Sequence, residues 1–160
     1  MRSRPSLILR AGKRGDIAAL CAIERRAFTH DRLSARSFAR FLRSPGASLI
    51  VAEAESGVSG YALTLFRKRG RVARLYSIAV DPTVRGRKLG SSLLTAVEAA
   101  AFNRRSKAMH LEVKPRNRRA LSLYRKRGYR VVGELGAYYE DGGKALRLEK
   151  ALELAPPRLR

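Results

Sequence analysis

The stretch that decides the fold is LYSIAVDPTVRGRKLG, residues 75–90. Its β-branched and apolar residues predict a strand, which passes through a basic, glycine-containing turn into a long helix with an apolar stripe. Such a turn presents free backbone N–H groups and the positive end of the helix dipole, which favour a phosphate or pyrophosphate. Many α/β proteins need the same turn only for packing. The turn carries the glycines and cations that an anion site would use, namely Arg85, Gly86, Arg87, Lys88 and Gly90.

The apolar periodicity on either side predicts a mixed α/β sheet, of the α+β kind, with helices on its faces. The expected order of elements is β-α-α-β-β-β-α-β-α-β-β, in one domain over residues 1–153 with a frayed tail over 154–160. Helices are expected from Asp16 to about Phe28, from Ser34 to the break at 44–46, from the 85–90 turn to about Asn103, and from Asn117 to Gly128. Strands are expected near residues 7–9, 47–55, 58–66, 72–80, 109–113, 129–138 and 145–151.

The composition is typical of a globular domain. The 160 residues are 45% hydrophobic and 30% charged, which is enough apolar material for a core. No apolar run approaches the ~20 residues of a membrane helix and no signal-peptide pattern opens the chain, so we expect a cytoplasmic protein with no membrane partner. Cys21, the single cysteine, lies in an apolar helical pattern that favours a core thiol over a nucleophile.

Charge is the unusual feature of the composition. The chain has 35 Lys and Arg against 13 Asp and Glu, which gives a net charge of +22. A protein with this net positive charge attracts polyanions. The basic residues are nevertheless scattered through every segment, and no nucleic-acid-binding motif is recognisable. We therefore expect no specific nucleic-acid partner, whereas any phosphate-bearing ligand would benefit from the charge.

Residues 77–90 resemble motif A of the GCN5-related N-acetyltransferases, the GNAT family. The motif, [QR]-x-x-G-x-[GA], follows a strand phrase that resembles residues 77–82. Arg85 fills its first position and Gly90 its last, but Lys88 stands where the middle glycine is usual. A left-handed backbone at that position would cost a lysine ~1–2 kcal/mol, so we expect a slightly remodelled pyrophosphate loop.

A second block makes the resemblance specific. Residues 111–129, LEVKPRNRRALSLYRKRGY, resemble the family's L-E-V-x-x-x-N-x-x-A-x-x-L-Y-x-x-x-G-[FY] block almost position by position. They are particularly similar to the branch that includes ribosomal-protein-alanine N-acetyltransferases. The resemblance covers residues 7–152 and implies a GNAT-like acyltransferase fold, with a central, mostly antiparallel mixed sheet and helices on both faces.

The resemblance also implies the chemistry and the residues that perform it. It assigns Glu112 as the proton acceptor and Tyr124 as the proton donor, with acetyl-CoA as the acetyl donor and no metal. The residues that it assigns to acetyl-CoA are Ile78, Ala79, Val80, Arg85, Gly86, Arg87, Lys88, Leu89, Gly90, Ser91 and Asn117.

Both catalytic assignments are chemically sensible. An α-amine with a pKa of ~8 must lose a proton before it attacks a thioester, and Glu112 lies on the polar side of its strand, where its carboxylate could line a cleft. Tyr124 could protonate a leaving thiolate whose pKa is ~8.5. The alternatives are a solvated strand carboxylate for Glu112 and a packed aromatic ring for Tyr124. Asn117 is adequate as a plain helix N-cap, and a contact with the cofactor could occur at the same time.

Other residues bear on metals and on the acceptor. His30 and His110 lack the spacing of metal ligands and are interpreted as structural or solvated. Two segments could form walls of an acceptor site, residues 138–141 beside the last hairpin and residues 28–32 between the first two helices. Aromatic residues beside a β-turn are also ordinary packing.

We expect an acetyl-CoA-dependent N-acetyltransferase that moves the acetyl group directly to a primary amine. The resemblance favours a protein N-terminal α-amine, and the alternatives are a small-molecule amine or a lysine side chain. A further alternative is a non-catalytic basic module that binds nucleic acid or the ribosome. The sequence leaves both a monomer and a homodimer open.

Overall fold

The computed structural model describes residues 6–84 and 88–153. Its helices and strands follow the predicted order, with two short 3₁₀ turns added at Arg14–Asp16 and Pro82–Val84. The strands are β1 (Ile8–Ala11), β2 (Ala47–Ala54), β3 (Gly57–Phe66), β4 (Val72–Val80), β5 (Ala108–Val113), β6 (Arg130–Leu135) and β7 (Ala145–Ala151). The helices are α1 (Ile17–Ala27), α2 (Ala35–Arg43), α3 (Leu89–Asn103) and α4 (Arg118–Lys126).

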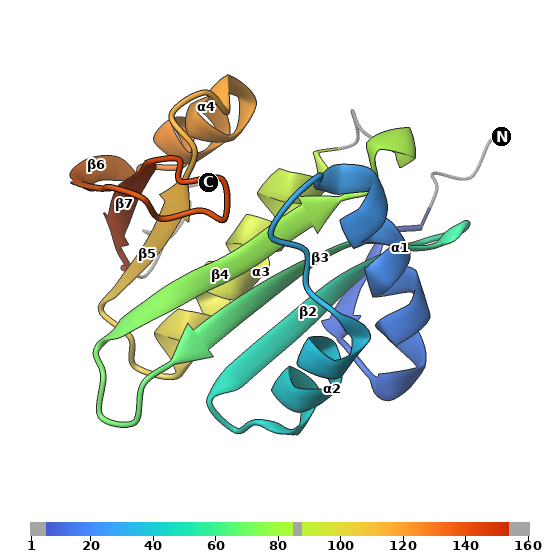
Figure 1. Cartoon of the computed structure of the whole chain (residues 1–160). Coiled ribbons are helices and arrows are strands. Elements are labelled where there is room, and N and C mark those ends of the chain that lie inside the picture. Colours follow the sequence, from blue (N-terminus) through green and yellow to red (C-terminus); the bar gives the residue numbers. More distant parts are fainter. Residues whose placement is uncertain (1–5, 85–87, 154–160) are drawn as a thin grey trace, which may run out of the picture.

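The strands form a single seven-stranded sheet in the order β1-β2-β3-β4-β5-β7-β6. Neighbouring strands are antiparallel except for β4 and β5, which are parallel and are connected through α3. Figure 1 shows α1 and α2 on one face of the sheet and α3 on the other. The expected mixed, mostly antiparallel sheet with helices on both faces is therefore confirmed.

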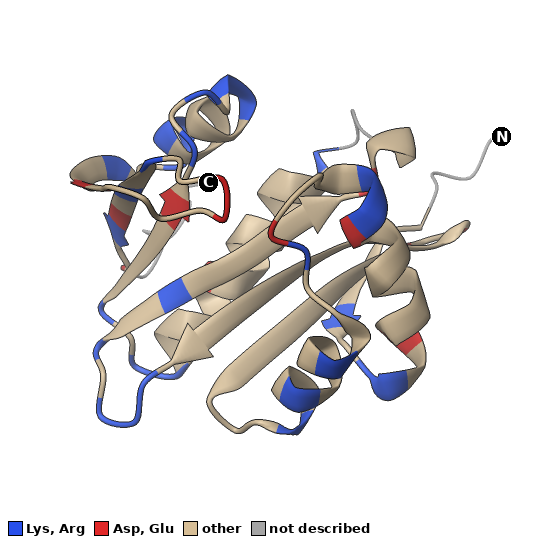
Figure 2. Cartoon of the chain, in the orientation of Figure 1, with Lys and Arg blue, Asp and Glu red and all other residues tan. Residues whose placement is uncertain are grey.

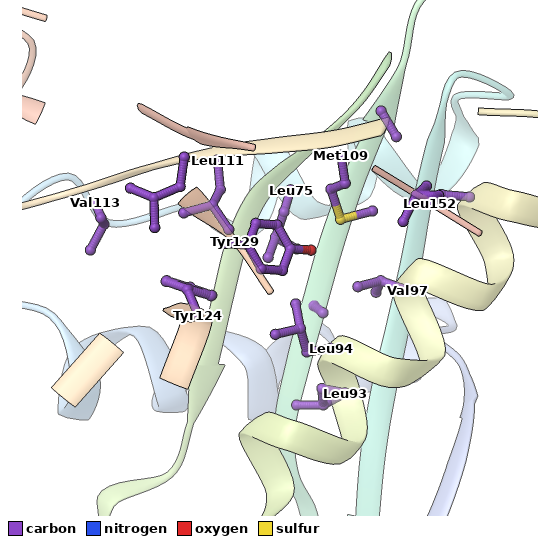
Figure 3. Close-up of a cluster of buried hydrophobic side chains, with 14 of the residues drawn as sticks. Leu75, Leu93, Leu94, Val97, Met109, Leu111, Val113, Tyr124, Tyr129 and Leu152 are labelled. Atoms are coloured by element: carbon purple, nitrogen blue, oxygen red, sulfur yellow. The ribbon is translucent and has the colours of Figure 1, made fainter. Parts of the chain in front are cut away.

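Two hydrophobic clusters fill the two faces. The first lies between the sheet and helices α3 and α4, and Figure 3 shows Leu93, Leu94 and Val97 of α3 directed at Leu75 and Met109 of the strands. Each such buried side chain contributes about 1.5–3 kcal/mol of hydrophobic stabilisation. The second cluster lies under α1 and α2, with these members: Leu20, Ile23, Phe38, Leu49, Val51, Tyr61, Leu63 and Ala79.

Local capping signals explain where the helices begin and end. The Ser34 hydroxyl accepts a hydrogen bond from the Ser37 N–H at the start of α2, and the Asn117 side chain does the same for the Ala120 N–H at the start of α4. Gly128 follows α4 with φ of 94°, a left-handed conformation that glycine adopts without strain. These three boundaries were readable from the sequence.

One helix cap and one strand boundary differ from the expectation. Asp16 occupies the N-cap of α1, but its carboxylate does not cap that helix, because it accepts hydrogen bonds from Arg10 and from the Lys13 N–H. The strand expected over residues 129–138 is only Arg130–Leu135, since the chain then turns and Ala137 adopts a positive φ of 50°. The tail expected to fray, residues 154–160, lies outside the described residues.

Basic residues are spread over the whole fold. Figure 2 shows Lys and Arg on helices, strands and turns alike, which agrees with the scattered charge of the sequence. Acidic residues are fewer, and some of them lie where the α1–α2 loop approaches the loop before β7. Over residues 6–84 and 88–153, no helix has both the length and the apolar character needed to cross a bilayer.

Candidate active site

The main feature of the site is an opening in the sheet between β4 and β5. These strands pair at three positions, Val72 with Ala108, Ala73 with Met109, and Arg74 with His110. The rest of β4, residues 75–80, pairs with β3 on its other side, and β5 continues along β7. The strands diverge beyond the paired ends, as Figure 1 shows. The facing edge of β4 therefore has backbone groups that β5 does not use.

A bulge in β4 lies beside this opening. The register between β3 and β4 shifts so that Leu63 faces Ser77 while Thr64 faces Leu75, which leaves Tyr76 as the extra residue. Tyr76 is 41% exposed, and its ring lies 5.6 Å from that of Phe41 on α2. The Arg74 guanidinium lies 5.3 Å from the centre of the Tyr76 ring. An aromatic and cationic surface thus lies next to the opening.

Helix α3 begins at the expected basic turn, but with a strained residue. Lys88 is the N-cap and has φ of 56° and ψ of 30°, a left-handed conformation that costs a lysine energy, at the position where the family motif has glycine. Among the described residues, no side chain caps the first turn of α3. Its first N–H groups are therefore available to an anion. Three predicted cofactor residues of this turn, Arg85, Gly86 and Arg87, lie outside the described residues.

The next predicted cofactor residues along α3 have mainly packing contacts. Leu89 is 3% exposed and belongs to the core, and a Cβ placed on Gly90 would meet Leu123 of α4 at 3.4 Å, an ordinary contact distance. The Ser91 carbonyl oxygen accepts a hydrogen bond from the Thr95 hydroxyl one turn later. Gly90 thus lies close to α4, and the backbone N–H groups of these three residues are what they could offer to a phosphate.

The predicted strand residues Ile78, Ala79 and Val80 lie on the last part of β4. They pair in register with residues 60–62 of β3, and Ala79 is 6% exposed. A Cβ on Gly60 would lie 3.0 Å from the Ala79 carbonyl oxygen, which is tighter than most contacts, so glycine favours the close approach of the two strands. This tight pairing fixes the path of β4 where it borders the opening.

Glu112 lies two residues beyond the last β4–β5 pair, with its side chain only 4% exposed. Its carboxylate is held by two arginines. The Arg74 Nε–H donates to Oε2 at 3.2 Å, and the Arg147 Nε–H and Nη2–H donate to Oε1 at 3.2 and 2.9 Å. The Glu112 carboxylate is therefore neither solvated nor free. Oε2 accepts one hydrogen bond and Oε1 accepts two, so Oε2 is the less firmly held oxygen.

Tyr124 projects from α4 into the first cluster and is 6% exposed. Its ring packs edge-on against that of Tyr129, 5.7 Å away, and its hydroxyl has no hydrogen-bond partner among the residues described. Burial raises the pKa of Tyr124, and Tyr139 raises it further. The hydroxyl is therefore protonated at neutral pH, as a proton donor must be.

Tyr139 connects the surroundings of the two predicted catalytic residues. Burial, with smaller contributions from Tyr138 and Glu112, raises the pKa of Tyr139 to about 12. The ring of Tyr139 lies edge-on to that of Tyr138, 4.9 Å away, and the Lys114 ammonium lies 4.8 Å from its centre. Tyr139 thus lies close enough to influence Glu112 and Tyr124 by charge.

The two predicted acceptor walls meet in the structure. The Asp31 N–H donates to Glu140 Oε2 at 3.5 Å, and the Glu140 N–H donates to Asp31 Oδ1 at 3.3 Å. The α1–α2 loop and the loop before β7 therefore lie side by side, 109 residues apart in sequence. The second wall also reaches the site, because the Tyr138 hydroxyl accepts a hydrogen bond from Arg74 Nη2 at 2.5 Å.

Sequence reasoning missed Arg74, Arg147 and Tyr76. Arg147 and Glu112 are directly opposite in the β5–β7 ladder, and the Glu112–Arg147 pairing needs a register that no local pattern reveals. Arg74 is recognisable only as an unusual charge inside the apolar strand that precedes motif A. That charge is the one signal that could have found it.

A buried polar cluster lies next to the site, under the α1–α2 loop. The Glu24 carboxylate accepts hydrogen bonds from the Tyr61 hydroxyl and, at 2.8 Å, from the Leu33 N–H. The Tyr61 and Ser77 hydroxyls are 2.7 Å apart. Burial raises the pKa of Glu24 despite these hydrogen bonds. The cluster connects α1, its following loop, β3 and β4.

Metal ligands do not gather in the described parts of the chain, 6–84 and 88–153, where no three of His, Cys, Asp and Glu form a group suited to a cation. His110 faces the same side of the sheet as Glu112, and burial lowers its pKa. His30 is exposed in the α1–α2 loop. Cys21 is partly buried against the second cluster, as expected for a packing thiol.

Comparison with known proteins identifies the family. Residues 17–129 match the model of the acetyltransferase (GNAT) family. A protein of Bacillus subtilis (strain 168), provisionally named a ribosomal protein bS18-alanine N-acetyltransferase, is 28% identical over 129 residues, 81% of this chain and 84% of the relative. The N-alpha-acetyltransferase RimI of Mycobacterium tuberculosis (strain H37Rv) is 34% identical over 109 residues, 67% of each chain.

A solved structure has the same fold. The ribosomal-protein-S18-alanine N-acetyltransferase from Escherichia coli superposes with a TM-score of 0.82 over 97% of this chain and 99% of its own, at 24% identity. The family uses acetyl-CoA as its donor, and the uncapped start of α3 and the open edge of β4 fit that donor. Since the family model spans more than half of the sequence, this chain belongs to the GNAT family and is an N-acetyltransferase.

Proposed function

We propose that this chain transfers an acetyl group from acetyl-CoA directly to a protein N-terminal α-amine. The observation that carries the proposal is the opening between β4 and β5, with the Glu112 carboxylate just beyond the last paired residues. The names of the relatives, which refer to ribosomal-protein alanines and α-amino groups, support this class of acceptor and, with it, a cytoplasmic location.

The donor would be held by backbone groups and by positive charge. The first N–H groups of α3, from Leu89 to Ser91, would face its phosphates, together with exposed Lys88 and, outside the described residues, the turn at 85–87. The open edge of β4 at residues 78–80 would align the pantetheine arm, with Asn117 at the start of α4 nearby. When bound, acetyl-CoA supplies an activated acyl thioester.

Glu112 and Tyr124 would move the two protons of the reaction. Glu112 accepts the proton that the attacking amine loses as its nitrogen bonds to the acetyl carbon, and Tyr124 donates a proton to the sulfur as the carbon–sulfur bond breaks. The protonated Tyr124 hydroxyl supports the second role. Glu112 must free part of its carboxylate to act, because both of its oxygens accept hydrogen bonds from arginine.

A direct transfer needs no nucleophile on the protein. Cys21, the single cysteine, lies on α1 and packs, partly buried, against the second hydrophobic cluster. This position supports attack by the acceptor amine itself. Each turnover should then release one CoA for each acetylated amine.

The proposal is tested by measuring CoA release with a panel of acceptors. Alanine-led peptides, peptides with a blocked N-terminus and an internal lysine, polyamines and aminoglycosides would be compared at equal concentration. The expected result is turnover with free peptide N-termini above all others. Preferred turnover of polyamines, aminoglycosides or internal lysine would contradict the proposed acceptor and leave the acetyltransferase assignment intact.

Binding of the donor can be measured separately. Acetyl-CoA should raise the melting temperature, because a ligand that binds only the folded state stabilises it by about 2.7 kcal/mol at one hundred times its dissociation constant. Free acetate should have no effect. No shift with millimolar acetyl-CoA would contradict the assignment of the opening as the donor site.

A further inference from the structure

Arg74 connects three segments at the mouth of the opening. It is the last β4 residue paired with β5, and its side chain is 33% exposed. Its Nε–H donates to Glu112 Oε2 at 3.2 Å, and its Nη2–H donates to the Tyr138 hydroxyl at 2.5 Å. One guanidinium therefore joins the proposed proton acceptor to the loop that forms an acceptor wall.

The two arginines on Glu112 hold it unequally. Arg147 is its direct partner in the β5–β7 ladder and donates two hydrogen bonds to Oε1, the shorter at 2.9 Å. Arg74 reaches from the other side of the opening and donates one hydrogen bond to Oε2. Its other partner, Tyr138, is on an exposed loop. Arg147 is thus suited to hold the Glu112 carboxylate in place. Arg74 is the arginine that can release the carboxylate and bind another group.

A guanidinium cannot take the place of a base. Arginine has five donor N–H groups and no acceptor, and it stays charged throughout the accessible pH range. The acceptor nitrogen must therefore reach Glu112 at an oxygen that an arginine gives up. Oε2 is that oxygen, since it accepts only one hydrogen bond, from Arg74 at 3.2 Å, whereas Oε1 accepts two from Arg147.

The exchange leaves Arg74 with donors to satisfy. In a peptide, the carbonyl oxygen of the first residue is three bonds from the α-amine nitrogen, so a guanidinium displaced by that amine can reach it. Guanidinium groups bind such planar oxygens well. A polyamine or the end of a lysine side chain offers no carbonyl at that place. Arg74 therefore has a partner in one class of acceptor and none in the other.

On this basis we infer that Arg74 is a specificity-determining residue, which yields Glu112 Oε2 to the acceptor amine and then binds the carbonyl oxygen of the acceptor's first residue. The inference rests on the proposed function, and it states why the site favours peptide N-termini over isolated amines. Tyr138 guides the guanidinium between its two positions by keeping the second hydrogen bond. Arg147 keeps Glu112 in place during the exchange.

The test compares two acceptors with wild type and three variants. The acceptors are an alanine-led tripeptide amide and an alkyl diamine of similar length without a carbonyl. The variants are Arg74→Gln, Arg74→Lys, and the control Arg130→Gln, which removes an exposed arginine from β6. Melting temperature and the KM for acetyl-CoA would be measured for each protein.

Arg74→Gln should lower kcat/KM for the tripeptide by about 10- to 100-fold, the scale of a lost hydrogen bond to a charged group. It should change kcat/KM for the diamine by less than about threefold, so the preference between acceptors collapses. Arg74→Lys keeps the positive charge but lacks the planar guanidinium group. Its kcat/KM for the tripeptide should therefore lie between those of wild type and Arg74→Gln. Arg130→Gln should match wild type with both acceptors, and the KM for acetyl-CoA should stay constant throughout.

An equal loss with both acceptors would overturn the inference, because it would make Arg74 a general support for Glu112. No loss with the tripeptide would overturn it as well. If Arg74→Gln does not fold, the same comparison of kcat/KM for the tripeptide and the diamine is made with Arg74→Lys, and an equal loss or no loss again overturns the inference. A wild-type protein that acetylates only the diamine contradicts the proposed acceptor, whereas tripeptide turnover with an unchanged preference in the Arg74 variants contradicts this inference alone.

Discussion

Arg74 on β4 pairs with His110 on β5, and this pair is the last that the two strands share. Beyond it, β4 stays with β3 and β5 continues along β7. The same residue, Arg74, holds the Glu112 carboxylate across the gap that the separation creates. The position where the sheet divides is thus also the position where the charged groups of the site converge.

Lys88→Gly should stabilise the protein. Lys88 adopts φ of 56°, which costs a side-chain-bearing residue about 1–2 kcal/mol, and glycine removes that cost while adding chain entropy to the unfolded state. The net gain should be up to about 1 kcal/mol, seen as a rise of a few degrees in melting temperature. Arg105→Gly, at φ of 66° just after α3, is the matched control and should behave alike. A lower melting temperature for Lys88→Gly would show that its side chain has a structural role that outweighs the strain.

Tyr124→Phe should slow transfer and leave the fold intact. The ring keeps its contact with Tyr129, and the lost hydroxyl has no hydrogen-bond partner among the described residues. If the hydroxyl protonates the thiolate, the transfer rate should fall about tenfold or more while the KM for acetyl-CoA stays the same, since the loss is confined to the transition state. Rapid-quench measurements that found equal transfer rates would return Tyr124 to a packing role.

Glu24→Gln should change how stability depends on pH. Burial raises the pKa of Glu24 above its ordinary value of 4.5, so its stabilising contribution is complete below that value and is lost as the pH rises through the folded-state pKa. Glutamine cannot ionise, and its amide can accept from the Leu33 N–H and donate to Tyr61, which can donate to Ser77.

The variant should therefore match wild type near pH 4 and exceed it in free energy of unfolding at pH 8. Each unit by which the pKa is raised corresponds to about 1.4 kcal/mol of this difference. Urea unfolding at both pH values measures it. A difference that is the same at pH 4 and pH 8 would mean that Glu24 titrates alike in the folded and unfolded chain.

The sequence predicted the elements well because their signals are local. The apolar stripe of α3, the caps at Ser34 and Asn117, and the glycine that ends α4 all depend on residues within a few positions of one another. The strand expected over residues 129–138 was predicted too long because the chain turns at Ala137, which has a positive φ, although the apolar pattern continues to Tyr138.

The site was only partly predictable because its geometry depends on long-range pairing. Glu112 and Tyr124 could be found by resemblance, but the separation of β4 from β5 depends on which strands pair and where they stop. The contacts of Glu112 come from residues 38 and 35 positions away, and the two acceptor walls are 109 residues apart. No local pattern encodes such contacts.

The most direct measurement of the central claim is single-turnover acetyl transfer to an alanine-led peptide, followed by mass spectrometry, with wild type and Glu112→Gln. Both proteins should show the same rise in melting temperature with acetyl-CoA, since Glu112 is not among the residues proposed to hold the donor. Wild type should give one acetylated α-amine for each CoA released, and Glu112→Gln should do so about 100-fold more slowly or slower still, with partial recovery as the pH is raised. Transfer by Glu112→Gln at the wild-type rate, in a folded protein that binds acetyl-CoA, would contradict the account.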